Sequence, residues 1–88
     1  MRVAFCDDSM NDIAKIKQII CRMVDYSFDY DVYISPLELI RCLYSGLRYD
    51  LYLLDIEMPE KSGISLARKI RELDTKALLV FLTSYTKY

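Results

Sequence analysis

Three short, uninterrupted apolar runs, separated by segments with helical periodicity, constrain the fold of this chain more than any other feature. The runs are Val3–Cys6, Leu51–Leu54 and Ala77–Leu82. Apolar runs of this length, without polar residues at alternate positions, are typical of strands that are buried on both faces of a parallel sheet. The sequence therefore predicts three buried parallel strands.

A fourth strand is predicted at residues 30–34, where the pattern alternates instead. One face of this segment carries Tyr30, Val32 and Ile34. The opposite face carries Asp31 and Tyr33, together with Asp29 directly before the segment. Alternation of this kind indicates a half-buried strand, and acidic side chains commonly protect the edge of a sheet. We expect this strand at one edge of the sheet.

Helical segments separate the four strands. The first is predicted to begin at Ser9, with Asp12 completing a capping box, and it repeats apolar residues at helical spacing as far as Val24. The third is predicted from about Ile64 to Leu73. Strands that alternate with helices imply an α/β fold with a parallel sheet and helices on both of its faces.

The second helix has the clearest start and stop signals. Ser35 is placed as its N-cap, Pro36 occupies the first helical position, Glu38 follows three residues after the cap, and Gly46 is placed to help end the helix. Because residues 30–34 have edge character and the other strands are buried runs, we expect strand order 2-1-3-4. The first helix should then cover one face, and the second and third helices the other.

Charge and composition exclude several classes of function. The chain has 12 basic and 13 acidic residues, so it carries no basic footprint for nucleic acid or for an anionic membrane. It has two glycines and no histidine, which excludes glycine-rich phosphate loops, His-based acid–base catalysis and a phosphohistidine carrier. The three cysteines are widely spaced, so we expect thiols rather than a zinc site.

Neither a signal peptide nor a membrane span is predicted. The longest apolar run, Ala77–Leu82, is far too short to cross a bilayer, and the N-terminal run lacks the length of a signal-peptide core. We therefore expect a cytoplasmic chain without membrane contact.

Polar side chains directly follow the three buried runs. Asp7 and Asp8 follow the first run, Asp55 follows the second, and Thr83 and Ser84 follow the third. The carboxyl ends of parallel strands share one edge, where ligands bind, so these residues should meet. Close carboxylates are costly unless a cation lies among them, and an all-oxygen set without His or Cys suits Mg²⁺.

A carboxylate beside Mg²⁺ can attack phosphorus and form an aspartyl phosphate. A hydroxyl at the end of the neighbouring strand could then hydrogen-bond the new phosphoryl group. The added charge would reorient a loop, which is the physical basis of a switch.

Three stretches carry a resemblance to a known family: Val3–Asp8 (VAFCDD), Leu53–Pro59 (LLDIEMP, with Gly63 following) and Val80–Tyr85 (VFLTSY). Over its whole length the chain resembles the receiver domains of bacterial two-component response regulators. The Cys before the acidic pair and the FLTSY run are most similar to receivers that precede a LytTR-type DNA-binding domain.

The resemblance implies roles for five residues by position. Asp55 corresponds to the phosphoacceptor, Asp8 to the direct Mg²⁺ ligand, and Asp7 to a ligand that binds largely through water. The main-chain carbonyl of Glu57 corresponds to a further metal ligand, and Thr83 to the switch hydroxyl. The implied fold is a flavodoxin-like, doubly wound parallel sheet, and the implied phosphodonor is a histidine kinase.

The chain departs from the family's pattern at its C-terminus. It ends at Tyr88, so we expect residues 1–88 to form an incomplete receiver domain whose fifth strand is absent. The family's Lys near the end of that strand is absent too, because Lys61, Lys76 and Lys87 do not follow a strand in the required place. The resemblance implies a signalling module rather than an enzyme, with DNA bound only through an output domain outside this chain.

The predicted fourth strand, Ala77–Leu82, would lie at an open edge of the sheet. It has no charge or proline to prevent pairing with another chain, and the first helix would be alone on its face. We therefore expect a homodimer or other self-association through this edge or face.

Three alternatives remain at this point. Asp8 alone could serve as an N-cap of the first helix. The chain could be a degenerate receiver that acts only as an interaction module. It could also be an aspartyl-nucleophile phosphohydrolase, although such enzymes carry an Asp-x-Asp-x-Thr run on their first strand, and Asp55–Pro59 matches it poorly. Mg²⁺-dependent labelling by a small phosphodonor separates these functions, since the label would be stable, absent or turned over.

Overall fold

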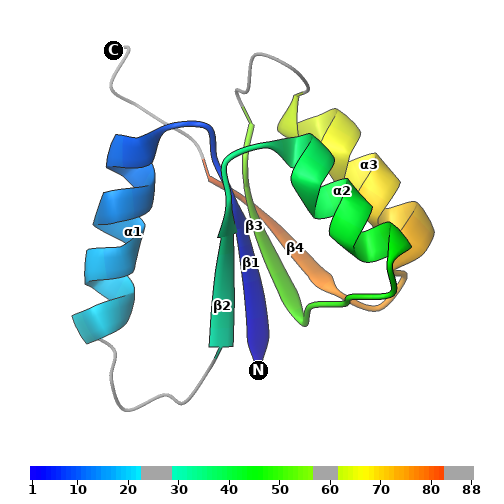
Figure 1. The fold of residues 1–88 in the computed structure, drawn as a ribbon, viewed down its shortest axis with the longest axis horizontal. Helices are drawn as coiled ribbons and strands as arrows, with labels where there is room; N and C mark the ends of the chain where they lie inside the picture. Colours follow the sequence, from blue (N-terminus) through cyan, green and yellow to red (C-terminus); the bar gives the residue numbers. More distant parts are fainter. Residues whose placement is uncertain (23–28, 57–61, 83–88) are drawn as a thin grey trace.

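The computed structural model shows a four-stranded sheet with helices on both faces (Figure 1). It describes residues 1–22, 29–56 and 62–82, apart from the side chains of residues 20 and 21. The described elements are, in chain order, β1 (Arg2–Cys6), α1 (Met10–Arg22), β2 (Asp29–Tyr33), α2 (Pro36–Tyr44), β3 (Leu51–Asp55), α3 (Gly63–Leu73) and β4 (Leu78–Leu82).

The strand order is β2-β1-β3-β4 and every neighbouring pair is parallel, which confirms the predicted sheet. At the carboxyl ends, Cys6 pairs with both Tyr33 and Leu54, and Asp55 pairs with Leu82. Figure 1 shows α1 on one face and α2 with α3 on the other, as the sequence predicts. This arrangement brings the residues that follow β1 and β3 to the same edge of the sheet.

The two edge strands differ from the expected burial patterns. In β2 only Tyr33 is buried, and it lies on the same face as the acidic Asp29 and Asp31, whereas Ile34 beyond the strand is 49% exposed. In β4, Leu78 is 62% exposed, although the sequence predicts a strand buried on both faces. The predicted burial of this strand is therefore wrong. Among the described residues β4 is an edge strand, with a neighbouring strand, β3, on one side only.

The starts of α1 and α2 follow the predicted signals in part. The main-chain N–H of Asp12 donates to Ser9 Oγ at 3.3 Å, as expected of a capping box. Ser35 has the extended conformation of an N-cap and Pro36 begins α2, but the Ser35 side chain accepts no capping hydrogen bond. Of the predicted start signals, Pro36 at the first helical position is therefore confirmed. Its ring fixes the backbone in a helical conformation and removes one N–H that would have no partner.

Gly46 ends α2, as predicted. Its φ of +103° is a left-handed conformation that glycine adopts without steric cost. The N–H groups of Gly46 and Leu47 donate to the carbonyl oxygens of Leu43 and Cys42, each at 3.1 Å, which is the Schellman arrangement.

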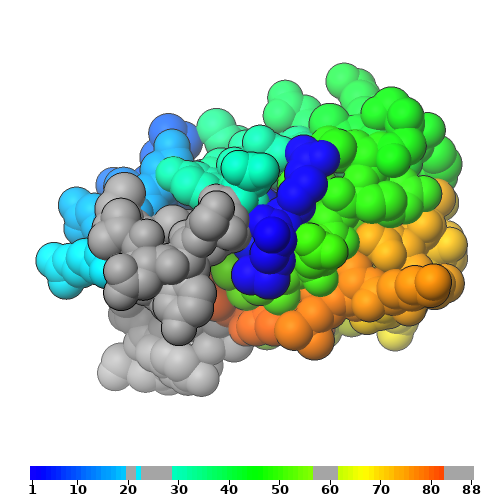
Figure 2. All heavy atoms as spheres, turned by 90° about the horizontal axis from the view of Figure 1, so that it is seen from below, coloured from blue at the N-terminus to red at the C-terminus, as the bar shows by residue number. Residues whose placement is uncertain are grey.

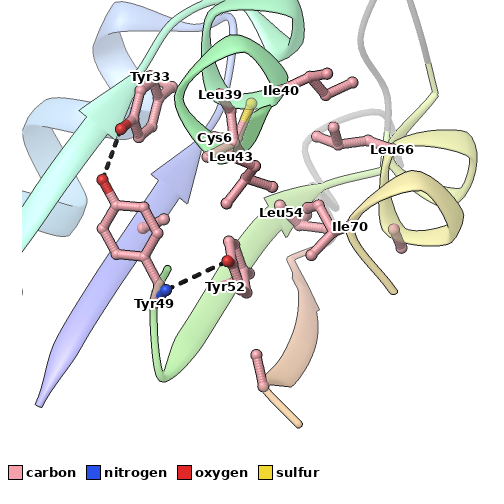
Figure 3. Packing of buried hydrophobic residues seen from close by; sticks show 13 residues of the cluster. Cys6, Tyr33, Leu39, Ile40, Leu43, Tyr49, Tyr52, Leu54, Leu66 and Ile70 are labelled. Atoms are coloured by element: carbon pink, nitrogen blue, oxygen red, sulfur yellow. Dashed lines mark hydrogen bonds between the residues drawn. The ribbon is translucent and has the colours of Figure 1, made fainter. Parts of the chain in front are cut away.

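The main core lies between the sheet and the α2–α3 layer (Figure 3). Its fully buried side chains include aliphatic residues of the sheet, of α2 and of α3, together with the phenol ring of Tyr52 in β3. Cys6 and Cys42 are thiols, as expected, whereas the side chain of Cys21 lies outside the described residues. No helix in the described ranges is long and apolar enough to cross a membrane.

Candidate metal centre

Three carboxylates converge at the carboxyl edge of the sheet. Asp7 and Asp8 come directly after β1, and Asp55 is the last residue of the neighbouring strand β3. One carboxylate oxygen from each residue lies within 4.8 Å of the corresponding oxygens of the other two. The parallel register of β1 and β3 produces this convergence, because both strands end at the same level.

Burial makes this cluster electrostatically unfavourable without a cation. Asp7 is 3% exposed and Asp55 is 9% exposed, whereas Asp8 reaches the solvent. Burial is the main factor that raises the pKa of Asp7 to about 6, and the negative charges of Asp55, Asp12 and Asp8 add to it. The hydrogen bond from the main-chain N–H of Ser9 acts in the opposite direction. A cation bound here would favour the ionised forms of all three carboxyl groups.

Asp7 is fixed from two sides. Its main-chain N–H donates to the carbonyl oxygen of Tyr33 at 3.1 Å, which links it to β2. Its Oδ1 accepts a hydrogen bond from the N–H of Ser9 at 2.9 Å. This second bond is not among the predictions from the sequence, although an Asp side chain in a turn commonly accepts from the main-chain N–H two residues further on. Ser9, rather than Asp8, provides the cap of α1.

Asp55 is held by the close approach of α3. The N–H of Gly63 donates to the carbonyl oxygen of Ile56 at 2.8 Å. A Cβ atom on Gly63 would lie 2.8 Å from the Cα of Ile56 and would overlap the carbonyl oxygen of Asp55. The side chain of Ser62 caps α3 by accepting from the N–H of Ser65 at 3.2 Å. Glycine at position 63 therefore lets α3 begin directly against the end of β3.

The other predicted site residues cannot be placed. Glu57 and Thr83 lie outside the described residues, and so do Ser84, Lys61 and Lys87. Lys76 precedes β4, so it lies at the end of the sheet where the strands begin and not at the carboxyl end that carries the acidic cluster. Its main-chain N–H donates to Asp74 Oδ1 at 3.3 Å.

The donor chemistry of the cluster fits Mg²⁺. All three groups are carboxylates, and neither nitrogen nor sulfur is among the ligand atoms of this set. Mg²⁺ prefers oxygen ligands and is commonly bound by one or two carboxylates while it keeps several waters. Asp8 is exposed beside the two more buried carboxylates, so the cluster reaches the solvent at Asp8.

Comparison with protein families identifies the kind of domain. The family model of the response regulator receiver domain matches residues 3–88. Transcriptional regulatory protein DltR of Streptococcus agalactiae is 43% identical over 61 residues, which are 69% of this chain and 24% of the relative. Transcriptional regulatory protein NatR of Bacillus subtilis is 33% identical over 88 residues, which are 100% of this chain and 37% of the relative. The chain thus spans well under half the length of these curated relatives.

Solved structures give the same result. Response regulator TrrA of Thermotoga maritima, in complex with Mg(2+)-BeF, matches with a TM-score of 0.80 at 32% identity, covering 99% of this chain and 72% of TrrA. TrrA in complex with histidine kinase ThkA matches with a TM-score of 0.78 at the same identity and coverage. On its sequence and its fold together, this chain belongs to the response regulator receiver domain family.

Proposed function

We propose that Asp55 is the phosphoacceptor of this receiver domain, and that Asp7, Asp8, Asp55 and the main-chain carbonyl of Glu57 hold a Mg²⁺ ion beside it. The observation that carries the proposal is the convergence of three carboxylates within 4.8 Å at the carboxyl ends of two adjacent strands. The structure of TrrA, which is a complex with Mg(2+)-BeF, supports the choice of metal.

The reaction is a transfer of a phosphoryl group to a carboxylate. An Oδ atom of Asp55 forms a bond to phosphorus while the P–N bond of a phosphohistidine breaks, and the electron pair passes to the imidazole nitrogen, which takes up a proton. Bound Mg²⁺ supplies positive charge that offsets the charge on the phosphoryl oxygens. Asp7 and Asp8 orient the metal, and the contact with Gly63 holds the main chain of Asp55. The hydroxyl of Thr83 then donates a hydrogen bond to the phosphoryl group.

The relatives support a phosphodonor and an output for this domain. The structure of TrrA with histidine kinase ThkA supports a histidine kinase as the donor for this chain. DltR and NatR are transcriptional regulatory proteins, which supports a DNA-binding output domain beyond residues 1–88 and a cytoplasmic parent protein. The Cys6–Asp8 and Phe81–Tyr85 stretches favour an output domain of the LytTR type.

We assign residues 1–88 to the N-terminal part of the receiver domain, and expect a second copy of this chain to pair with β4. Leu78, Val80 and Phe81 on this edge strand are 62%, 37% and 39% exposed. An edge of this length without charge or proline is a template for pairing with another strand.

Labelling with a small phosphodonor tests the proposed function against its alternatives. The full-length parent is incubated with acetyl phosphate in the presence of Mg²⁺ or of EDTA. We expect a stable, Mg²⁺-dependent label. A parent that takes up no label is a degenerate receiver, and one that releases phosphate continuously is a phosphohydrolase.

A further inference from the structure

Tyr33 connects the acidic cluster to β2, the edge strand next to β1. Its main-chain carbonyl accepts the N–H of Asp7, and its side chain is the single buried one in β2. β2 is an edge strand, and its other residues are exposed or only half-buried. The contacts of the Tyr33 ring therefore help to set the position of the end of β2. They also help to set the position of the Tyr33 carbonyl oxygen, which accepts the N–H of Asp7.

A chain of buried hydroxyl groups holds that ring (Figure 3). The hydroxyls of Tyr33 and Tyr49 are 2.6 Å apart, and the Tyr49 hydroxyl donates to Asp31 Oδ2 at 2.6 Å. A phenol has one proton and a carboxylate only accepts, so Tyr33 donates to Tyr49, which donates to Asp31. The two rings also meet edge to face, with their centroids 6.2 Å apart. Tyr49 precedes β3, so these hydrogen bonds connect the end of β2 to the segment that leads into β3.

Arg2 contacts the last two members of this series of hydrogen bonds, Tyr49 and Asp31. Its guanidinium lies 3.6 Å from Asp31 Oδ2 and stacks over the ring of Tyr49, 5.3 Å from the ring centroid. Its main-chain N–H donates to Asp50 Oδ2 at 2.8 Å. Figure 2, which views the molecule from the end where the strands begin, shows the first residues of β1 at the surface between β2 and the segment entering β3. Tyr49 is thus fixed on both of its sides.

We infer that Tyr33 and Tyr49 are positioning residues for the metal site: through the carbonyl of Tyr33 they set the position of the Asp7 main chain, and so the affinity of the acidic cluster for Mg²⁺. The inference rests on the proposed function, because it assigns Asp7 to a metal site. Neither tyrosine belongs to the set of carboxylates that would hold the metal. Each acts through the hydrogen bond between Asp7 and Tyr33.

The test compares Tyr49→Phe and Tyr33→Phe with a matched control, Tyr52→Phe. Tyr52 is also a buried phenol, and its hydroxyl bonds an aspartate, Asp74, at 3.1 Å. That hydroxyl also accepts the main-chain N–H of Tyr49 at 3.3 Å, but it takes no part in the side-chain hydrogen bonds from Tyr33 through Tyr49 to Asp31, so Tyr52→Phe leaves those bonds in place. Mg²⁺ alone is titrated into each ¹⁵N-labelled protein, and the dissociation constant is read from amide chemical shifts. Hydrogen exchange of the Asp7 amide and urea unfolding are measured on the same samples.

We expect Tyr49→Phe and Tyr33→Phe to weaken Mg²⁺ binding by about tenfold, the lower end of what loss of a group that orients a metal ligand costs. Both should also accelerate exchange of the Asp7 amide, whereas Tyr52→Phe should lose stability and keep the affinity. Tyr33→Phe retains the bond between Tyr49 and Asp31, so it serves if Tyr49→Phe does not fold. Unchanged Mg²⁺ affinity in a folded variant, with normal binding by the unaltered protein, overturns this inference alone. Absence of Mg²⁺ binding in the unaltered protein overturns the proposed function, and this inference with it.

Discussion

Gly63 lies so close to Asp55 that a Cβ atom on it would overlap the carbonyl oxygen of Asp55. Replacing Gly63 by Ala must therefore displace the end of β3, which carries the proposed phosphoacceptor. We predict that Gly63→Ala lowers the free energy of unfolding by about 1–3 kcal/mol, as other overpacked sites do. It should also slow Mg²⁺-dependent labelling of the parent by acetyl phosphate. Urea unfolding and the rate of labelling measure the two effects.

Gly46→Ala is the matched control for this prediction. Gly46 has a φ of +103° and open space around its Cβ position, so Ala there costs about 1–2 kcal/mol through backbone strain alone. It should destabilise the protein to a similar extent and leave the rate of labelling unchanged at temperatures where the variant is folded. Equal labelling rates for both glycine variants would show that Gly63 does not position Asp55.

Removing the charge of Asp7 should stabilise the metal-free protein. Burial raises the pKa of Asp7 from 3.8 to about 6, so its ionised form at neutral pH opposes folding. We predict that Asp7→Asn raises the free energy of unfolding in EDTA at neutral pH by up to about 3 kcal/mol, since one pKa unit corresponds to about 1.4 kcal/mol. Asn retains the oxygen that accepts from Ser9.

Asp8→Asn is the comparison for the Asp7 variant. Asp8 is exposed, so its replacement should stabilise the metal-free protein much less, while both variants should bind Mg²⁺ more weakly. Equal Mg²⁺ affinity in Asp8→Asn and the unaltered protein would remove Asp8 from the ligand set. Calorimetric titration with Mg²⁺ gives the affinities.

Much of this site can be predicted from the sequence because it follows from strand order. The apolar runs that end at Cys6 and Leu54 specify buried neighbouring strands, and parallel pairing then brings the following aspartates to one edge. The edge position of β2 follows from the alternation of residues 30–34. These features depend on local patterns and on the direction of the strands, which the amino-acid order records.

Other features depend on distances between segments, which no local pattern contains. The hydrogen bonds from Tyr33 to Tyr49 and from Tyr49 to Asp31 depend on how the loop before β3 meets β2. The contact of Gly63 with Asp55 likewise depends on how α3 approaches β3. The roles of Glu57 and Thr83 remain predictions.

The buried tyrosines should make the fold sensitive to alkaline pH. Burial is the main factor that raises the pKa of Tyr33 and of Tyr52 to about 12, and it also raises the pKa of Tyr49. A folded-state pKa above the unfolded value of about 10 gives stability that is present below pH 10 and is lost as the pH rises towards 12. We predict that the urea midpoint falls over this range and that Tyr52→Phe reduces the fall. Phenol absorbance that titrates completely near pH 10 in a protein with native circular dichroism would contradict this.

The exposed β4 edge should make the 88-residue chain self-associate. Leu78 is 62% exposed on this strand, so a charge there should interrupt pairing with a second copy. We predict that sedimentation velocity shows a concentration-dependent dimer or larger species, which Leu78→Lys shifts towards monomer. Leu37→Lys is the control, because Leu37 is similarly exposed, at 51%, but lies on α2. A folded monomer at high concentration would show that β4 recruits no second copy.

The central claim is that Asp55 accepts a phosphoryl group in the presence of Mg²⁺, and one measurement tests it most directly. The full-length parent and its Asp55→Asn variant are incubated with acetyl phosphate and Mg²⁺, and intact mass and peptide mapping locate any label. Asn is nearly isosteric with Asp, so folding is checked by circular dichroism. We predict one phosphoryl group on Asp55 of the unaltered protein, none in EDTA and none in Asp55→Asn. Undiminished labelling of folded Asp55→Asn, or a label mapped to another residue of the unaltered protein, would contradict this account.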